Sequence, residues 1–149
     1  MTSNEIKKII LSSNTIIWNF AVPEVTISGT ADIFGQRLGG DWIEIEIKLT
    51  LSDLKAERKK IRHHPNNSEI NYSDYRYFCV SENIAEKAIE YIKSNYPNYG
   101  IYVCDGKEIV NVHRAKRLNR TSTIDLSIIC IYLYRRYKTL LNKQPEGRS

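Results

Sequence analysis

Residues 41–49 read Asp41-Trp-Ile-Glu-Ile-Glu-Ile-Lys-Leu49, and this stretch decides the fold. Apolar and polar side chains alternate along it over eight residues, which is typical of a β-strand. One face then carries Ile43, Ile45, Ile47 and Leu49, and we expect that face to meet a core. The other face carries Trp42, Glu44, Glu46 and Lys48. This polar face is either the solvent side of an ordinary strand or the lining of a site, depending on what lies opposite.

A second strand is predicted just before this one, over residues 26–34, with a turn at residues 35–40. The glycine pair Gly39-Gly40 is where a hairpin turn is expected. A hairpin centred on Gly39 pairs positions whose numbers sum to 78, so Asp32 lies opposite Glu46. Directly opposed residues have Cβ atoms about 5 Å apart. The hairpin therefore predicts two carboxylates side by side.

The rest of the chain alternates between helices and strands. Helices are predicted for residues 4–11, 50 to about 63, 83–95 and 123–141, and strands for residues 15–22, 74–80, 100–104 and 107–113. Pro23 is expected to end the first strand. This order predicts a single α/β domain over residues 1–141, with a mixed β-sheet flanked by helices. Residues 142–149 are polar, and we expect them to form a disordered tail.

The net charge of +5 is unevenly distributed along the 149 residues. Residues 107–143 carry nine Lys or Arg and two acids, a net +7, so the remainder of the chain is slightly acidic. Segregated positive charge favours an acidic partner, nucleic acid first and an anionic membrane second. A solvated helix face is the alternative explanation for these charges.

The cysteines and the apolar segments bear on the cellular compartment. Cys79, Cys104 and Cys130 show no metal-ligand spacing and lie among apolar residues, as buried thiols do. The N-terminus shows no apolar signal segment, and the longest apolar run, around residues 128–133, is too short to cross a bilayer. These features predict a cytoplasmic protein with no membrane partner.

The predicted pair of carboxylates suggests a metal site. Two opposed carboxylates repel each other, and a divalent cation between them would remove that cost. Magnesium prefers oxygen ligands and usually takes one or two carboxylates together with waters and a substrate phosphate. Lys48 follows Glu46 on the same face, where it can reach an attacking water or a phosphate. Two metal ligands, an activated water and a cation for developing negative charge are the parts that phosphodiester hydrolysis needs.

The spacing of these residues resembles a known nuclease superfamily. Ala31-Asp32, then thirteen residues, then Glu46-Ile-Lys48 is similar to the PD-(D/E)XK pattern, whose members share a helix, a β-hairpin or three-stranded meander, a helix and a further strand. Alanine stands before Asp32 in place of the motif's proline. A more local resemblance, over about residues 26–113, is to small MmcB-like DNA-repair nucleases and similar phage or bacterial proteins. The segments that carry it are residues 46–50, 52–54, 59–60, 75–80 and 99–103.

The resemblance implies a restriction-endonuclease-like core and a Mg²⁺-dependent deoxyribonuclease that also accepts Mn²⁺. Such an enzyme would hydrolyse DNA phosphodiester bonds in DNA repair, recombination or phage DNA processing. Asp32, Glu46 and Lys48 would be catalytic, and Asp32 and Glu46 would hold the metal, with Glu5 as a candidate third acid. We expect no separate substrate-recognition domain within these residues, so the target stays open. The accessory candidates near the site are Asp53 and Glu44.

The basic residues would supply the contacts to DNA. The candidates are Lys59, Lys60, Arg114, Lys116, Arg117, Arg135 and Arg136. The same residues would serve a rival function, a non-catalytic nucleic-acid-binding module on the same fold that uses the basic C-terminal third. A third hypothesis is a small interaction protein in which the Glu-x-Lys pattern is coincidental. DNA is thus the expected partner, and a homodimer stays open because the sequence shows no interface signature.

Overall fold

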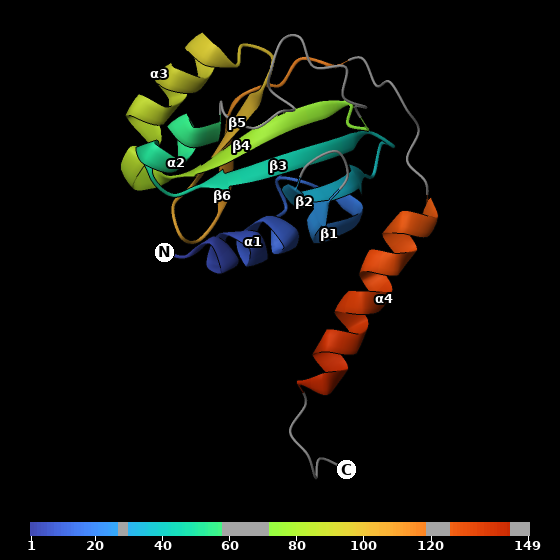
Figure 1. Cartoon of the computed structure of the whole chain (residues 1–149). Helices are drawn as coiled ribbons and strands as arrows, with labels where there is room; N and C mark the ends of the chain where they lie inside the picture. Colours follow the sequence, from blue (N-terminus) through green and yellow to red (C-terminus); the bar gives the residue numbers. More distant parts are fainter. Residues whose placement is uncertain (27–29, 58–71, 119–125, 144–149) are drawn as a thin grey trace.

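The computed structural model describes residues 1–26, 30–57, 72–118 and 126–143 (Figure 1). Its elements are α1 (Ser3–Ser12), β1 (Trp18–Thr26), β2 (Thr30–Arg37), β3 (Trp42–Lys48), α2 (Leu51–Ala56), β4 (Tyr75–Ser81), the short 3-10 helix η3 (Glu82–Ile84), α3 (Ala85–Asn95), β5 (Gly100–Cys104), β6 (Ile109–His113) and α4 (Leu126–Asn142). Helices and strands follow one another in the predicted order. The prediction of an α/β fold with a mixed sheet is confirmed.

The six described strands form one sheet in which the spatial order follows the chain order from β1 to β6. The first three strands are antiparallel neighbours. The strands β3, β4 and β5 are parallel, because α2 and α3 carry the chain back between them. The last strand, β6, returns antiparallel beside β5 after the Asp105-Gly106 turn, where Gly106 has a φ of 95°.

Helices cover both faces of the sheet (Figure 1). The helix α1 packs Ile6 and Ile10 onto the face that carries Ile43 and Ile45 of β3. The helices α2 and α3 cover the opposite face, where their apolar side chains form a second core with β4 and β5. A third cluster joins the first half of α4, through Ile129, to β1, β2 and the start of β3. In the described ranges, no helix combines the length and the apolar character needed to cross a membrane.

Both faces of β3 are buried, so the solvent-face explanation of its polar residues does not apply. Glu44 is 3% exposed, Glu46 6% and Lys48 8%. Burying charged groups is costly unless they are paired or bind an ion. The acidic and basic residues of this strand therefore need partners inside the protein, a bound ligand, or both.

The predicted hairpin register between β2 and β3 is confirmed. The aligned pairs Ile33–Ile45, Phe34–Glu44, Gly35–Ile43 and Gln36–Trp42 each sum to 78. The turn is closed by hydrogen bonds between Arg37 and its neighbours, including Arg37 N to the Asp41 oxygen at 2.8 Å. The glycine that needs a left-handed conformation there is Gly40, with a φ of 99°.

Two predicted boundaries were wrong. Pro23 does not end the first strand, because β1 lies at the edge of the sheet, where a missing N–H costs no ladder bond. Gly35 is not in the turn but in the middle of β2, which runs on to Arg37. A Cβ at Gly35 would lie 2.5 Å from the Phe20 oxygen of β1. The glycine therefore permits a close approach of two strands rather than a bend.

The helix predicted from residue 50 begins as expected. Thr50 is the N-cap of α2, and its Oγ1 accepts a hydrogen bond from the N–H of Asp53 at 3.1 Å. The described part of this helix ends at Ala56, with Glu57 following as its cap. The predicted continuation to about residue 63 lies outside the described residues, as does the predicted tail beyond residue 143.

Candidate functional site

The three residues predicted to be catalytic line one cleft. It lies between the β2–β3 hairpin and α2 and has a volume of about 280 Å³. Its lining residues are Asp32, Glu46, Ile47, Lys48, Asp53, Ala56 and Glu57. The side chains of Asp32 and Glu46 therefore open into the same space and do not point to opposite faces of the sheet. Asp53, predicted as an accessory acid, lies at the same cleft from the first turn of α2.

Asp32 sits where β2 and β3 separate. The aligned pairs of this hairpin end at Ile33–Ile45, and Asp32 and Glu46 occupy the next position. There the carboxylate of Asp32, through Oδ2, accepts a hydrogen bond from the backbone N–H of Ile47 at 2.7 Å. A side chain thus takes the amide that the neighbouring strand would otherwise bind, and this orients the carboxylate. An ionised carboxylate has about four acceptor sites, so this bond leaves capacity for a metal ion.

Glu46 and Lys48 are held rigidly by the parallel strand beside them. Glu46 is aligned with Phe78 and Lys48 with Val80, and both partners belong to the core under α2 and α3. Glu46 and Lys48 both lie in the strand, not in a loop, and both are buried. Sites built on strands position side chains more precisely than sites on loops. The polar pair at the end of β3 is therefore fixed in direction before any ligand arrives.

A residue that the sequence did not single out, Glu57, completes the cleft. Its carboxylate lies 2.7 Å from Nζ of Lys48, and its side chain is fully buried. Leu54, three residues earlier, is also fully buried, so both project inward from the same side of α2. The sequence does contain one indication of this acid: Asp53 and Glu57 lie one helical turn apart in the helix predicted directly after the strand that carries Lys48. The sequence alone does not reveal how closely the end of α2 approaches β3.

The charges of Lys48 and Glu57 balance each other, so the net charge of the cleft comes from its other acids. A buried lysine must be paired to remain charged in a water-poor site. An ammonium has three donors, so one contact with Glu57 leaves further donors for a water or a phosphate oxygen. The cleft thus holds the carboxylates of Asp32, Glu46 and Asp53 and a cation that Glu57 already compensates. Adding a divalent cation at Asp32 and Glu46 would offset the negative charge of these two residues.

The donor set fits magnesium better than a fully protein-bound metal. In the described part of the chain, no three His, Cys, Asp or Glu side chains gather into a group that could hold a metal ion. Two carboxylates in an open cleft match the way magnesium is usually held, with the other positions left to waters and substrate. The residues present therefore fit a magnesium ion that the substrate helps to bind.

Two other acids named from the sequence do not line this cleft. Glu5 lies in the first turn of α1, on an exposed surface, where its carboxylate accepts a hydrogen bond from the hydroxyl of Thr2. Glu44 is buried two residues before Glu46 in β3, with Oε2 3.4 Å from Nε of Arg76. The guanidinium of Arg76 also donates to the hydroxyl of Tyr99 at 3.2 Å. Glu44 thus belongs to a buried ion pair beside the site.

The basic segment after β6 lies at the other end of the sheet. The N–H of Lys116 bonds to the Asn98 oxygen, just before β5 begins. Arg117 contacts Asp41 at 2.8 Å and Asp74 at 3.2 Å, the residues that precede β3 and β4. Glu46 and Lys48 lie where β3 ends. Residues 114–117, predicted to bind DNA, therefore do not border the cleft.

Arg117 has a structural role in this arrangement. Its guanidinium stands over the ring of Tyr75, 5.3 Å from the centroid, with Arg37 at 5.0 Å from the same ring. Tyr75, through its ionisable hydroxyl, raises the pKa of Arg117 most, and Asp74 and Asp41 raise it further. Asp74 is buried and also accepts a hydrogen bond from the N–H of Trp42 at 2.9 Å. This cluster ties the segment after β6 to the beginnings of β3 and β4.

The two arginines of α4 lie nearer to the cleft. Arg135 and Arg136 line a groove of about 170 Å³ together with Pro23 and Glu24 of β1. Pro23 pairs with Ile33, the residue after Asp32, so this groove lies one strand away from the site. The remaining predicted DNA contacts, Lys59 and Lys60, lie outside the described residues.

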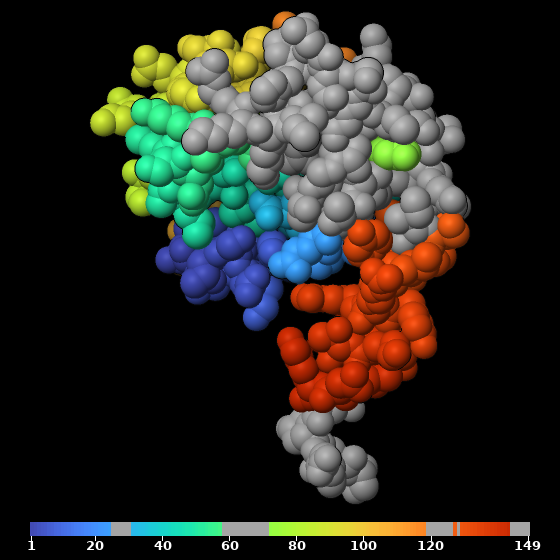
Figure 2. Space-filling view, in the orientation of Figure 1, coloured from blue at the N-terminus to red at the C-terminus, as the bar shows by residue number. Residues whose placement is uncertain are grey.

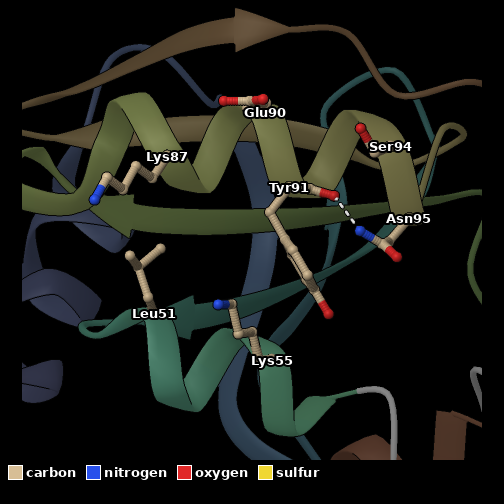
Figure 3. A pocket seen from close by; sticks show the side chains of 7 residues that line it. All are labelled: Leu51, Lys55, Lys87, Glu90, Tyr91, Ser94 and Asn95. Carbon is tan, nitrogen blue, oxygen red and sulfur yellow. Dashed lines mark hydrogen bonds between the residues drawn. The ribbon is translucent and has the colours of Figure 1, made fainter.

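A second cavity, of about 310 Å³, lies between α2 and α3 (Figure 3). Its lining residues are Leu51, Lys55, Lys87, Glu90, Tyr91, Ser94 and Asn95. The amide of Asn95 is already used by the backbone oxygen of Tyr91 at 2.9 Å. This cavity brings together no pair of carboxylates, so its larger size does not make it the better candidate for metal-dependent chemistry.

Fold and cleft together define the class, an α/β protein with a six-stranded mixed sheet and an acidic cleft at the end of a central strand. No model of a known protein family matches the chain, and no curated protein matches it either. A solved structure with the same fold is SPO1766, a protein of unknown function from Silicibacter pomeroyi. The two share 16% sequence identity and a TM-score of 0.60, over 87% of this chain and 82% of the other. At this identity, the similarity establishes the fold alone.

Proposed function

We propose that this chain is a metal-dependent nuclease of the PD-(D/E)XK type that hydrolyses DNA phosphodiester bonds. The observation that carries the proposal is the shared cleft of Asp32, Glu46 and Lys48, built on adjoining strands of one hairpin. The order of elements from α1 to β4 agrees with the helix, meander, helix and strand of that superfamily. The three free thiols fit a reducing, cytoplasmic setting.

Each residue of the cleft has a role in this proposal. Asp32 and Glu46 hold the metal ion, and the amide of Ile47 keeps Asp32 turned toward it. Bound Mg²⁺ would supply an activated water and would neutralise charge on the phosphate. Lys48 donates to the attacking water or to a phosphate oxygen, which stabilises negative charge that develops during the reaction. Glu57 holds the Lys48 ammonium in its position and compensates its charge.

A polymeric substrate suits the shape of this surface. The cleft opens between the hairpin and α2, and the groove that Arg135 and Arg136 line is one strand away, beyond β2. Arginine is well suited to phosphate because its planar fork can donate two parallel hydrogen bonds. A nucleic-acid backbone that passes the cleft can therefore reach these two arginines. DNA repair, recombination or phage DNA processing are the settings that we propose.

The proposal is tested with a cleavage assay on single-stranded, duplex and branched DNA, in Mg²⁺, in Mn²⁺ and in EDTA. We expect wild-type protein to cut at least one of these substrates with metal and none in EDTA. Asp32→Asn should abolish cutting and leave DNA binding largely intact. Lys48→Met made together with Glu57→Leu, which leaves no buried charge unpaired, should do the same. Binding without cutting in every condition would favour the non-catalytic nucleic-acid-binding module. Neither binding nor cutting would favour a protein that acts through other partners.

A matched pair of variants separates chemistry from folding. Glu46 and Glu44 are both buried glutamates on the same face of β3, but only Glu46 lines the cleft. We expect Glu46→Gln to lose Mn²⁺ binding, measured by titration calorimetry, together with DNA cutting. Glu44→Gln weakens an ion pair with Arg76 and should lower the thermal midpoint while keeping both functions. Equal loss of function in the two variants at matched stability would remove the special role of Glu46.

A further inference from the structure

One side of α4 is apolar and exposed. The helix packs onto the third core cluster through Ile129 and Tyr132, both in its first half. Beyond that contact, Arg135, Arg136 and Thr139 still line a groove with β1, and the end of the helix extends away from the sheet (Figures 1 and 2). Tyr137 is 59% exposed and Leu140 57%, with Leu133 at 44%. A soluble helix seldom leaves such a row of large apolar side chains in water unless the row meets a partner.

The exposed apolar residues have the spacing of a helix-pairing seam. Cys130, Leu133, Tyr137 and Leu140 follow one another at intervals of three, four and three residues. This spacing places all four on one narrow stripe of the helix, which is the pattern that packs against another helix. Cys130 is exposed as well. Neither a flat lipid surface nor a phosphate backbone requires this regular alternation.

The charges beside this stripe indicate which helix it meets. Arg136 and Lys143 lie along one flank, whereas Tyr134 and Leu141 lie along the other, which is uncharged. An acidic partner helix would leave the uncharged flank unmatched. In a parallel pair of identical helices, the basic flank of each meets the uncharged flank of the other. In an antiparallel pair the two basic flanks would face each other and repel.

We propose that this stripe of α4 pairs in parallel with the same stripe of a second copy of the chain, forming a two-fold dimer. The same apolar residues of the two chains pack against each other, as a two-fold interface requires. Arg136 of each chain meets an aromatic and apolar flank, and a cation already lies over Tyr134 within the chain, with Nζ of Lys138 5.6 Å from the ring centroid. The dimer does not depend on the nuclease proposal, since no cleft residue takes part. Arg136, which flanks the stripe, is also one of the two arginines proposed to contact DNA.

The test compares two exposed apolar residues of the same helix. Leu133 lies in the stripe, whereas Ile131 is 48% exposed and lies outside it. Sedimentation equilibrium of the full chain should give twice the 17.3 kDa mass for wild type. Leu133→Glu should give the monomer mass and Ile131→Glu the dimer mass, with unchanged circular dichroism in both. A wild-type monomer at tens of micromolar, or an equal response of the two variants, would overturn the proposal.

A crosslinking experiment tests the parallel direction. Parallel pairing places the two Cys130 thiols opposite each other, whereas antiparallel pairing about the centre of the stripe places Cys130 opposite Leu140. These two residues lie ten positions apart, about 15 Å along a helix. A short bismaleimide should therefore join two chains through Cys130, and Cys130→Ser should prevent this. A dimer that resists this crosslinker would overturn the parallel arrangement.

A membrane or DNA could also cover the stripe, and binding measurements on the same variants test these two alternatives. Vesicles of anionic phospholipid and a short DNA duplex are each added to wild type and to Leu133→Glu. If wild type is a monomer and Leu133→Glu loses binding to vesicles or to the duplex, the stripe binds a membrane or DNA, and the proposal is wrong. Binding that is equal in the two proteins, together with a Leu133-dependent dimer, supports the pairing of two chains.

Discussion

Replacing Glu57 with glutamine removes a negative charge from a fully buried position and leaves the shape of the side chain almost unchanged. The carboxylate lies 2.7 Å from Nζ of Lys48, whose side chain is 9% exposed. Water therefore does not screen this pair as it screens a surface ion pair. The substitution leaves a buried ammonium without the charge that compensates it, so we expect Glu57→Gln to destabilise the fold strongly.

The magnitude follows from the geometry. At 2.7 Å and an effective dielectric constant near 20, two unit charges attract by about 6 kcal/mol. The cost of removing both charges from water offsets much of this attraction, and breaking one partner of a buried pair typically costs about 3–5 kcal/mol. Since whole domains are stable by about 5–15 kcal/mol, we expect a visible loss. Replacing both residues, as in Lys48→Met with Glu57→Leu, should cost far less.

Urea unfolding followed by tryptophan fluorescence measures this difference. For a protein of this size, a loss of about 4 kcal/mol moves the midpoint by about 2 M. The control is Glu24→Gln, because Glu24 contacts Nζ of Lys7 at 2.9 Å but is 60% exposed, so its loss should cost under about 1 kcal/mol. Equal shifts for Glu57→Gln and Glu24→Gln would refute the reasoning that burial makes the Lys48 pair strong.

Three further predictions concern parts of the fold away from the cleft. Asp74→Ala should lower the free energy of unfolding by about 2 kcal/mol in urea titrations, because it strands a buried backbone N–H, whereas Arg117→Ala should cost under about 1 kcal/mol. Burial raises the pKa of the Cys79 thiol, so at pH 8 in dilute protein a thiol reagent should label Cys130 and spare Cys79 until denaturant is added. Gly35→Ala should lower the thermal midpoint, because its Cβ meets the backbone of β1, and an unchanged midpoint would contradict that close approach.

The hairpin could be predicted because its information is local. The alternation of residues 42–48 and the turn at Gly39-Gly40 determine both the strand and its register. The position of Gly35 could not be predicted in this way, since it depends on the close packing of β1 against β2. The sequence predicts a strand end at Pro23 for a similar reason, because nothing in it marks β1 as an edge strand.

In the site, too, the local contacts could be predicted from the sequence and the long-range contacts could not. Asp32 and Glu46 are neighbours through a short turn, and their meeting could be predicted from numbering alone. Glu57 reaches Lys48 through the crossover between two parallel strands, and its approach depends on how α2 packs. The basic residues show the same limit. Residues 114–117 and Arg135 are all part of a basic stretch in the sequence, but the fold sends them to opposite ends of the sheet.

The chain order of the strands leaves the two outer strands with very different edges. Along β1, Pro23 offers no donor, the register shifts between Trp18 and Phe20, and Glu24 adopts a φ of 58°. Such irregularities prevent another strand from adding in register, and they protect a protein against aggregation through its edge. Along β6 the register shifts only near its C-terminal end, where Val112 is skipped between Asn111 and His113, while residues 109–111 pair regularly and Val110 is exposed. Among the described strands, β6 is therefore the edge where misassembly would begin, and a lysine at position 110 would protect it.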